Sequence, residues 1–425
     1  MNQQAKQNYA LPIAVMFALF FMIAFVTGLA NPMGVIAQSQ FGASNFEAQL
    51  GVLANFIAYA FMGIPSGMML NKIGYKNTAI VAVVVGFVGV GVQCFSGVLA
   101  SFNFYLIGAF ISGFSMCLLN TVVNPMLNTL AGGGNKANQL LQFGGALNSI
   151  AATITPVLVG YLMGDAASRS IDKAYPVMFI AMAVFALAFI VLLVVRIPEP
   201  QRTSENENIG IFSPLKFRHL TFGIIAIFVY VGIEVGIPST ANLYMTKELN
   251  IDAGIAGAVV GIYWFLMMIG RFIGGVIGGK VSTKTMMSTV ATVGLIFIAL
   301  GIILPTSISV TIPTVNEPLP INLLFFCLCG LCTSVMWGGI FNLAVEGLGK
   351  YTAAASGLFM VMVCGGGIIP AIQGALADKI DYLPSYWLIF ACVAYILWYS
   401  LVGSKNVNKD IPTGTSAIDK DVANE

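Results

Sequence analysis

The chain has 425 residues, of which 58% are hydrophobic and 8% are charged, and its formal net charge at pH 7 is +2. Soluble proteins carry about 25% charged residues, so this chain has too little polar surface to cover a globule in water. The composition excludes a soluble enzyme and makes the lipid bilayer the expected partner. The small net charge and the scattered basic residues exclude a nucleic-acid partner.

Membrane-spanning helices are predicted along the whole chain. A bilayer core about 30 Å thick takes roughly 20 helical residues, and twelve apolar stretches are long enough. The stretches are 9–37, 48–70, 78–99, 103–130, 138–163, 175–195, 219–246, 253–279, 286–306, 319–345, 352–376 and 384–403. The first is too long for the apolar region of a signal peptide, and none shows the alternation of barrel strands. The sequence predicts an all-α integral membrane protein with 12 transmembrane helices.

The distribution of Lys and Arg predicts the orientation, because cytoplasmic loops carry an excess of these residues. When the loops are assigned alternately to the two sides, 14 of the 19 basic residues fall on one side and four on the other, and Arg271 lies within a span. Both termini are therefore predicted to be cytoplasmic.

Two landmarks occur twice in the chain. The spacing G-x-x-x-x-K-x-small-x-K covers 67–76 and again 275–284, and Pro-x-x-x-Gly begins at Pro156 and at Pro370. These repeats predict two six-helix pseudo-symmetric bundles, an arrangement typical of secondary transporters that rock about a site near the midplane. The predicted domains are the N-terminal bundle 1–197, the cytoplasmic linker 198–218, the C-terminal bundle 219–403 and the cytoplasmic tail 404–425.

Two ionisable residues, Glu234 and Arg271, fall well inside predicted spans. Each costs on the order of 3 kcal/mol at mid-bilayer unless it is paired or hydrated. Two interpretations remain open: Glu234 binds or relays a coupling cation, or the two residues pair and hold the C-terminal helices together. Glu346, near a cytoplasmic helix end, is expected to be a structural partner of nearby basic residues.

Amide and aromatic side chains are the candidates for recognising a ligand. Amides can hydrogen-bond the polar groups of a small ligand, and aromatic faces can cover its apolar side. The candidate substrate-binding residues are Asn31, Asn120, Asn124, Gln142, Asn148, Trp264, Trp337, Asn342 and Gln373. Asn55 and Gln139 place further amides in the spans. For every amide the alternative is packing between helices, since an amide that faces lipid leaves its polar groups unsatisfied.

Several of these motifs resemble one known family. The run 67–76 resembles the loop between spans 2 and 3 of the major facilitator superfamily, with Asn71 where many members have Asp. Residues 118–125 resemble span 4 of the fucose, glucose/galactose and N-acetylglucosamine permeases. The segments 230–236, 270–274 and 347–370 resemble spans 7, 8, 10 and 11 of the same permeases.

The resemblance implies a monosaccharide importer, driven by protons or another cation, with a central cavity between the two bundles. It also implies gating or structural roles at the cytoplasmic face. The residues concerned are Asn71, Lys72, Lys76, Lys280 and Lys284, with Arg271 inside the membrane.

The chain departs from this family at three positions. The acidic residues of spans 1 and 4 in proton-coupled members match Gly34 and Asn120, and the glutamine of span 5 matches Gly145. Gln142, one helical turn earlier, can offer its amide to the same cavity. These departures leave the coupling ion open between H+, Na+ and none.

The sequence as a whole predicts a secondary active transporter that imports a small neutral monosaccharide by alternating access. We expect a monomer in the inner membrane, without a cofactor other than a coupling H+ or Na+. An uncoupled sugar facilitator and an exporter of another small metabolite or drug are the alternatives. An intramembrane enzyme is not expected, because the sole histidine, His219, lies at a helix end and no H-E-x-x-H motif occurs.

Overall fold

The computed structural model describes residues 9–28, 45–99, 101–163, 171–199, 209–311 and 318–413. Within these ranges the chain is helical apart from short connections and one small hairpin. The predicted site residue Asn31 and the departure at Gly34 lie outside them.

The helices before the linker form one group, here called the N-terminal group. It consists of α1 (Ala10–Gly28), α3 (Asn45–Val98), α4 (Phe102–Leu130), α5 (Gly134–Met163) and α6 (Ile171–Val194). The apolar part of α3 is 46 residues long, about twice the length that crosses a bilayer. It breaks at Gly74, whose φ of 81° only glycine adopts readily, so α3 is two helices joined at the predicted loop motif.

The helices after the linker form the C-terminal group. Its elements are η2 (Ser213–Lys216), α8 (Arg218–Leu243), η3 (Tyr244–Glu248), α9 (Ala253–Gly278), α10 (Thr283–Ile303), β1 (Ser309–Thr311), β2 (Pro318–Pro320), α11 (Ile321–Thr333), α12 (Met336–Val345), η4 (Gly349–Tyr351), α13 (Thr352–Val361), η5 (Met362–Cys364), α14 (Gly365–Ile380), α15 (Tyr382–Trp398) and η6 (Tyr399–Gly403). The strands β1 and β2 pair antiparallel, a hairpin that the sequence did not predict. The predicted span 319–345 is interrupted between α11 and α12, and the predicted span 352–376 between α13 and α14.

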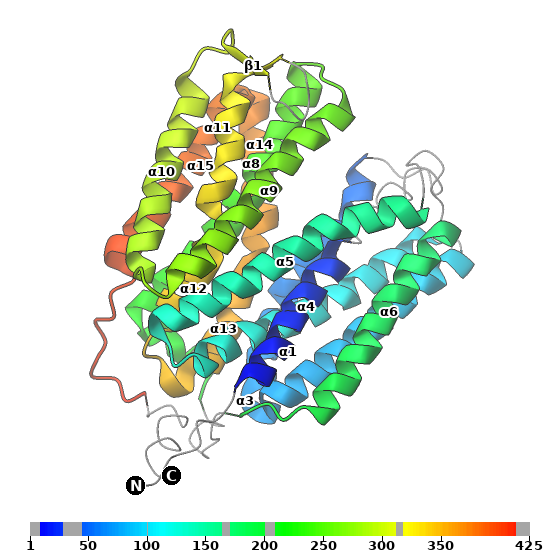
Figure 1. The fold of residues 1–425 in the computed structure, drawn as a ribbon, viewed down its shortest axis with the longest axis vertical. Coiled ribbons are helices and arrows are strands. Elements are labelled where there is room, and N and C mark those ends of the chain that lie inside the picture. The colour runs from blue at the N-terminus through cyan, green and yellow to red at the C-terminus, as the bar shows by residue number, and fades with distance from the viewer. Residues whose placement is uncertain are drawn as a thin grey trace.

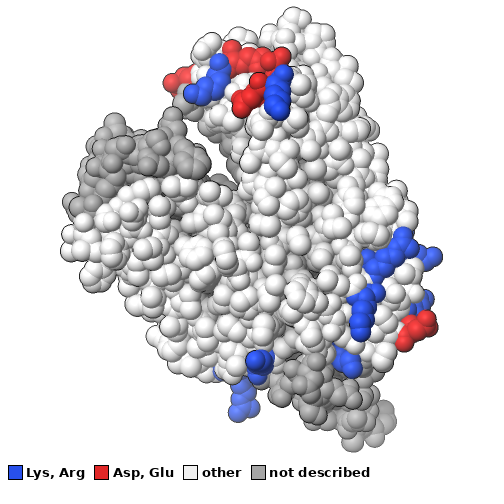
Figure 2. All heavy atoms as spheres, turned by 180° about the vertical axis from the view of Figure 1, so that it is seen from behind, with Lys and Arg blue, Asp and Glu red and all other residues white. Residues whose placement is uncertain are grey.

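Ten helices within the described ranges are long and apolar enough to cross a membrane, and the double helix α3 counts once among them. The prediction of a helical, multi-span membrane protein is therefore confirmed. Figure 2 agrees with it, because the visible charged side chains lie in patches at the helix ends, separated by a broad band without Lys, Arg, Asp or Glu. The number of twelve spans, the cytoplasmic placement of the termini and the domain boundaries stay predictions.

The two groups approach each other at one end and diverge toward the end that carries β1 (Figure 1). The contact between them, here called the seam, joins α5 to α9 and α12, and α3 to α13. The start of α1 and the segment 404–413 both lie toward the end where the groups meet. That C-terminal segment is held by hydrogen bonds from the backbone nitrogens of Arg218 and Lys350.

Glycines allow backbone contact across the seam between α3 and α13. A Cβ atom added at Gly357 would lie 2.7 Å from the carbonyl oxygen of Gly63 and 2.8 Å from the Cα of Gly67. These neighbours are backbone atoms and cannot rotate away. The two helices therefore pack at this distance only while position 357 lacks a side chain.

We predict that Gly357→Val forces the seam apart. Overpacking costs about 1–3 kcal/mol, which corresponds to a shift of about 5- to 150-fold in the conformational equilibrium. The measurement is the distance distribution between spin labels at Lys136 and Lys284, which are exposed residues of the two groups, in a cysteine-free background. The matched control is Gly374→Ala, because nothing lies within 4 Å of a Cβ added there. An unchanged distance distribution for Gly357→Val would contradict the prediction.

Candidate functional site

A chain of amide hydrogen bonds runs along α4 to the opposite group. Asn120 Nδ2 donates to the hydroxyl of Tyr59 over 2.7 Å and to the carbonyl of Met116 over 3.1 Å. Asn124 Nδ2 donates to the carbonyl of Asn120 over 2.8 Å. Trp337 Nε1 of α12 then donates to Asn124 Oδ1 over 3.1 Å. The structure therefore brings together three of the predicted residues, Asn120, Asn124 and Trp337, at the seam.

The two ionisable residues of the predicted spans form an ion pair. Arg271 Nη2 of α9 lies 2.9 Å from Glu234 Oε1 of α8, and the two side chains are 10% and 16% exposed. Arg271 Nη1 also reaches the N-terminal group, where it donates to Ser149 Oγ over 2.6 Å and to the carbonyl of Gly145 over 3.3 Å. One guanidinium therefore connects the membrane carboxylate to α5 of the other group.

Gly145 lies against the side chain of Arg271. A Cβ atom added at Gly145 would lie 3.4 Å from Arg271 Cδ and 3.6 Å from Arg271 Nε, which is ordinary van der Waals contact. The position at which the sequence departs from the resembling permeases is therefore a direct neighbour of the ion pair.

Aromatic side chains surround the ion pair and the amide chain. The rings of Tyr230 and Trp337 meet edge to face with centroids 6.3 Å apart, and the Tyr263 hydroxyl donates to the Glu234 backbone carbonyl over 3.3 Å. Tyr230 lies one helical turn before Glu234, and its buried hydroxyl lies close to the Glu234 carboxylate and the Arg271 guanidinium. This combination of amides, a hydroxyl and an indole suits a ligand that is polar at its edge and apolar on its face.

Here the name central cluster denotes Tyr59, Asn120, Asn124, Ser149, Tyr230, Glu234, Arg271 and Trp337. Three of these residues, Tyr59, Ser149 and Tyr230, were not predicted as site residues. Hydroxyl side chains are common inside helical bundles, so their presence alone does not indicate a site. The one usable signal was the spacing of four residues between Tyr230 and Glu234, which places both on the same face of a helix.

Gln142 and Asn342 lie at the seam. Gln142 Nε2 donates to the carbonyl of Val335 over 2.9 Å. Asn342 Oδ1 accepts from Asn128 Nδ2 over 2.8 Å, and Asn342 Nδ2 donates to the carbonyl of Gly134 over 3.2 Å. Both residues therefore fasten the two groups together in this conformation.

The remaining predicted ligands, Asn148, Trp264 and Gln373, have contacts other than the hydrogen bonds that join the central cluster. Asn148 Nδ2 donates to the carbonyl of Phe20, and Trp264 is 40% exposed, with its ring against that of Tyr263. Gln373 is fully buried beside Gly236 of α8, and neither of its side-chain polar atoms has a partner among the described residues. The sugar-binding roles given to these three residues stay predictions.

The predicted gating residues differ in their contacts. Lys76 Nζ donates to the carbonyls of Leu193 and Val195, so it caps the end of α6 within its own group. The contact of Glu346 is made by its backbone carbonyl oxygen, which lies 3.0 Å from His219 Nε2. Asn71 and Lys72 lie next to the break at Gly74. Lys280, which follows α9, and Lys284, in the first turn of α10, are exposed. These gating roles also stay predictions.

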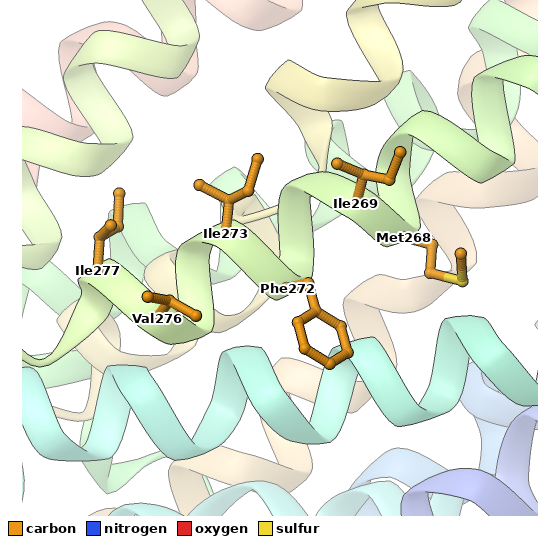
Figure 3. Close-up of a pocket in the computed structure, with 6 residues that line it drawn as sticks. All are labelled: Met268, Ile269, Phe272, Ile273, Val276 and Ile277. Atoms are coloured by element: carbon orange, nitrogen blue, oxygen red, sulfur yellow. The ribbon is translucent and has the colours of Figure 1, made fainter.

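A groove of about 310 Å³ on the surface of α9 is unsuitable for a sugar. It is lined by Met268, Ile269, Phe272, Ile273, Val276 and Ile277. Figure 3 shows these side chains projecting from one stretch of α9, and none of them carries a nitrogen or an oxygen atom. Within the described ranges, no three His, Cys, Asp or Glu side chains are grouped so that they could hold a metal ion.

Comparisons with known proteins agree with this architecture. The sequence profile of the Major Facilitator Superfamily matches residues 15–371. The chain is 30% identical over 419 residues to a "Putative glucose/galactose transporter" of Helicobacter pylori, with 94% of this chain and 98% of that protein covered. It is 25% identical over 423 residues to the "L-fucose-proton symporter" of Escherichia coli, with 93% of both chains covered.

A solved structure shows the same fold. The crystal structure of a Major Facilitator Superfamily transporter, FucP, in the outward conformation matches with a TM-score of 0.80 at 20% sequence identity, covering 94% of this chain and 100% of that chain. The resemblance noted in the sequence is thereby confirmed. The chain belongs to the Major Facilitator Superfamily.

Proposed function

We propose that this protein imports a small neutral monosaccharide across the inner membrane by alternating access. The observation that carries the proposal is the central cluster, which joins amides, hydroxyls and the Trp337 indole from both groups. A sugar bound there would contact both groups and would be released as they separate. The relatives named as glucose/galactose and fucose transporters support the choice of a sugar over another metabolite.

We also propose that import is coupled to H+ or Na+ and that Glu234 relays the coupling through Arg271. The ion pair occupies the carboxylate, and the same guanidinium binds Ser149 of the N-terminal group. Any change at Glu234 therefore alters a contact between the groups. A membrane potential of 100 mV supplies about 2.3 kcal/mol per charge, enough for roughly fifty-fold accumulation with one cation.

The sugar proposal predicts saturable uptake of at least one monosaccharide into proteoliposomes. The panel contains radiolabelled glucose, galactose, fucose and N-acetylglucosamine, with proton and sodium gradients imposed separately. Sugar accumulation under one gradient is expected, and sugar exchange without accumulation would indicate the uncoupled facilitator. Failure of every sugar to compete, together with transport of a cationic or amphiphilic compound, would support the exporter and contradict the proposal.

Replacing the acceptor of the Trp337 indole is predicted to weaken sugar binding. Asn124→Leu leaves Trp337 Nε1 without its acceptor and removes an amide from the cluster. Losing such hydrogen bonds costs about 1–3 kcal/mol, so the KM for uptake should rise about tenfold. The control is Asn77→Ala, an exposed amide that donates to the carbonyl of Ile73. If the Asn124→Leu variant folds normally and has the KM of the wild type, Asn124 has no role in sugar binding.

The coupling proposal is tested on the ion pair. Glu234→Gln or Arg271→Gln alone leaves a buried charge unpaired, and each should lower the free energy of unfolding by about 3–5 kcal/mol. The double variant restores electrical neutrality, so we expect it to fold and to exchange sugar without a gradient. Its gradient-driven accumulation should fall to the level of exchange. Accumulation equal to wild type in the double variant would show that the pair has only a structural role.

A further inference from the structure

The groove on α9, here called the α9 groove, is made by the side chains of one helix and is open to the outside of the molecule. α9 packs mainly against α5 and α11, and α10 packs mainly against α11 and α15, so the contact between α9 and α10 is slight. Figure 3 shows Ile269, Ile273 and Ile277 in a row along α9, with Phe272 directed toward α5. Ile273 is 51% exposed and Val276 is 61% exposed. Among the described residues, this side of α9 therefore has no protein partner that covers it.

The α9 groove is about as long as one leaflet of a bilayer is deep. Its lining residues run from 268 to 277, and ten helical residues at 1.5 Å each extend for about 15 Å. The hydrocarbon core is about 30 Å thick, so one leaflet contributes about half of that length. The lining carries no nitrogen or oxygen atom and suits a hydrocarbon occupant. An acyl chain of a phospholipid therefore fits the groove in both length and polarity.

One end of the α9 groove meets a group of lysines. The backbone nitrogen of Lys280 donates to the carbonyl of Ile277, the last lining residue, over 2.9 Å. Lys284 lies in the first turn of α10, and Lys136 lies in the first turn of α5. All three lysines are exposed. Here the name lysine cluster denotes Lys136, Lys280 and Lys284.

The lysine cluster draws on both groups of helices. Asn342 Nδ2 donates to the carbonyl of Gly134 over 3.2 Å and to Thr283 Oγ1 over 2.9 Å. Lys136 follows the first of these partners by two residues, and Lys284 directly follows the second. One amide therefore holds together the segment of the N-terminal group and the segment of the C-terminal group that carry the lysines.

The charge of the lysine cluster is not balanced by the protein. In the part of the chain that the structure describes, none of the three lysines forms an ion pair with Asp or Glu. They lie at the end that the basic residues predict to be cytoplasmic, where the leaflet carries anionic lipids that attract Lys and Arg. We propose that the α9 groove and the lysine cluster bind one anionic phospholipid, with an acyl chain along α9 and the phosphate between the lysines.

A lipid bound in this way bridges the two groups. Its phosphate contacts Lys136 of the N-terminal group and Lys280 and Lys284 of the C-terminal group, and these contacts are lost when the groups separate at this end. A ligand that prefers one conformation shifts the equilibrium toward that conformation. The lipid therefore favours the closed seam. The binding site stands without the sugar assignment, whereas its effect on transport rests on the proposed function.

The direct test is binding of dioleoylphosphatidylglycerol to the purified, delipidated full-length protein, measured by native mass spectrometry without sugar. We expect one tightly bound molecule per chain, and binding of dioleoylphosphatidylcholine about tenfold weaker. The triple variant Lys136→Gln, Lys280→Gln and Lys284→Gln should weaken phosphatidylglycerol binding about fivefold for each lysine removed. The matched control is the double variant Lys247→Gln and Lys379→Gln, which removes exposed lysines from the loops predicted to lie on the opposite side of the membrane.

A second variant tests whether the acyl chain lies in the groove. Ile273→Trp fills the groove without a change of charge and should weaken phosphatidylglycerol binding about tenfold. Its matched control is Ile190→Trp, at an exposed position of α6. Inorganic phosphate, which has no chain, should not compete with the lipid. Equal binding of the two lipids would overturn the proposal. Wild-type affinity in the triple variant or in Ile273→Trp, or competition by inorganic phosphate, would overturn it as well.

The bridging of the groups has its own measurement. Spin labels are placed at Asn77 and Thr289, exposed residues of the two groups, in a cysteine-free background. Addition of phosphatidylglycerol to phosphatidylcholine nanodiscs should shift the distance distribution toward the shorter distance, and it should not do so in the triple lysine variant. A distribution that ignores phosphatidylglycerol in a protein that binds it would overturn the bridging role.

The lipid site and the sugar assignment can fail separately. Phosphatidylglycerol binding is measured without sugar, and sugar exchange in proteoliposomes is measured without any gradient. Lipid binding without sugar exchange would support the lipid site and reject the sugar assignment. Sugar exchange by a protein that does not distinguish the two lipids would do the opposite.

Discussion

Hydrocarbon offers no hydrogen bonds, and the structure of this protein depends on that constraint. An amide or a charge that faces lipid is left unsatisfied, and nearly all of those described in the spans have a partner inside the protein, with Gln373 as an exception. The partners come mostly from the opposite group or from the preceding helical turn. The bonds of Asn128 to Asn342, of Gln142 to the carbonyl of Val335 and of Arg271 to Ser149 all cross between the groups. Polar residues therefore gather where two halves meet, which is also where a transported solute must pass.

The central cluster satisfies this constraint with contacts between the two groups. Trp337 of α12 donates to Asn124 of α4, and Arg271 of α9 donates to Ser149 of α5 while it pairs with Glu234. The same guanidinium also donates to the carbonyl of Gly145. One indole and one guanidinium therefore hold the amides and the carboxylate of the cluster between the groups.

The sequence predicted most of the membrane helices, but it predicted few of the contacts at the candidate site. Apolar length predicted the membrane helices, and the motif around Gly74 predicted the break in α3, because a φ of 81° demands glycine. The break between α11 and α12 was missed, since the residues on both sides are apolar. The spacing of residues along one helix shows which of them share a face of that helix. It does not show which other helices pack against that face. The ion pair of Glu234 with Arg271 and the seam position of Asn342 therefore required the structure.

The hydrogen bonds that fasten the seam at Asn128, Gln139, Gln142 and Asn342 are all between uncharged groups. When such bonds break, no charge is displaced through the electric field of the membrane. These four contacts therefore contribute no net charge movement of their own when the helices separate. Among the residues described at the seam inside the spans, the charged ones are Arg271 and its partner Glu234, so the membrane voltage acts there on the ion pair and leaves the amide contacts unaffected.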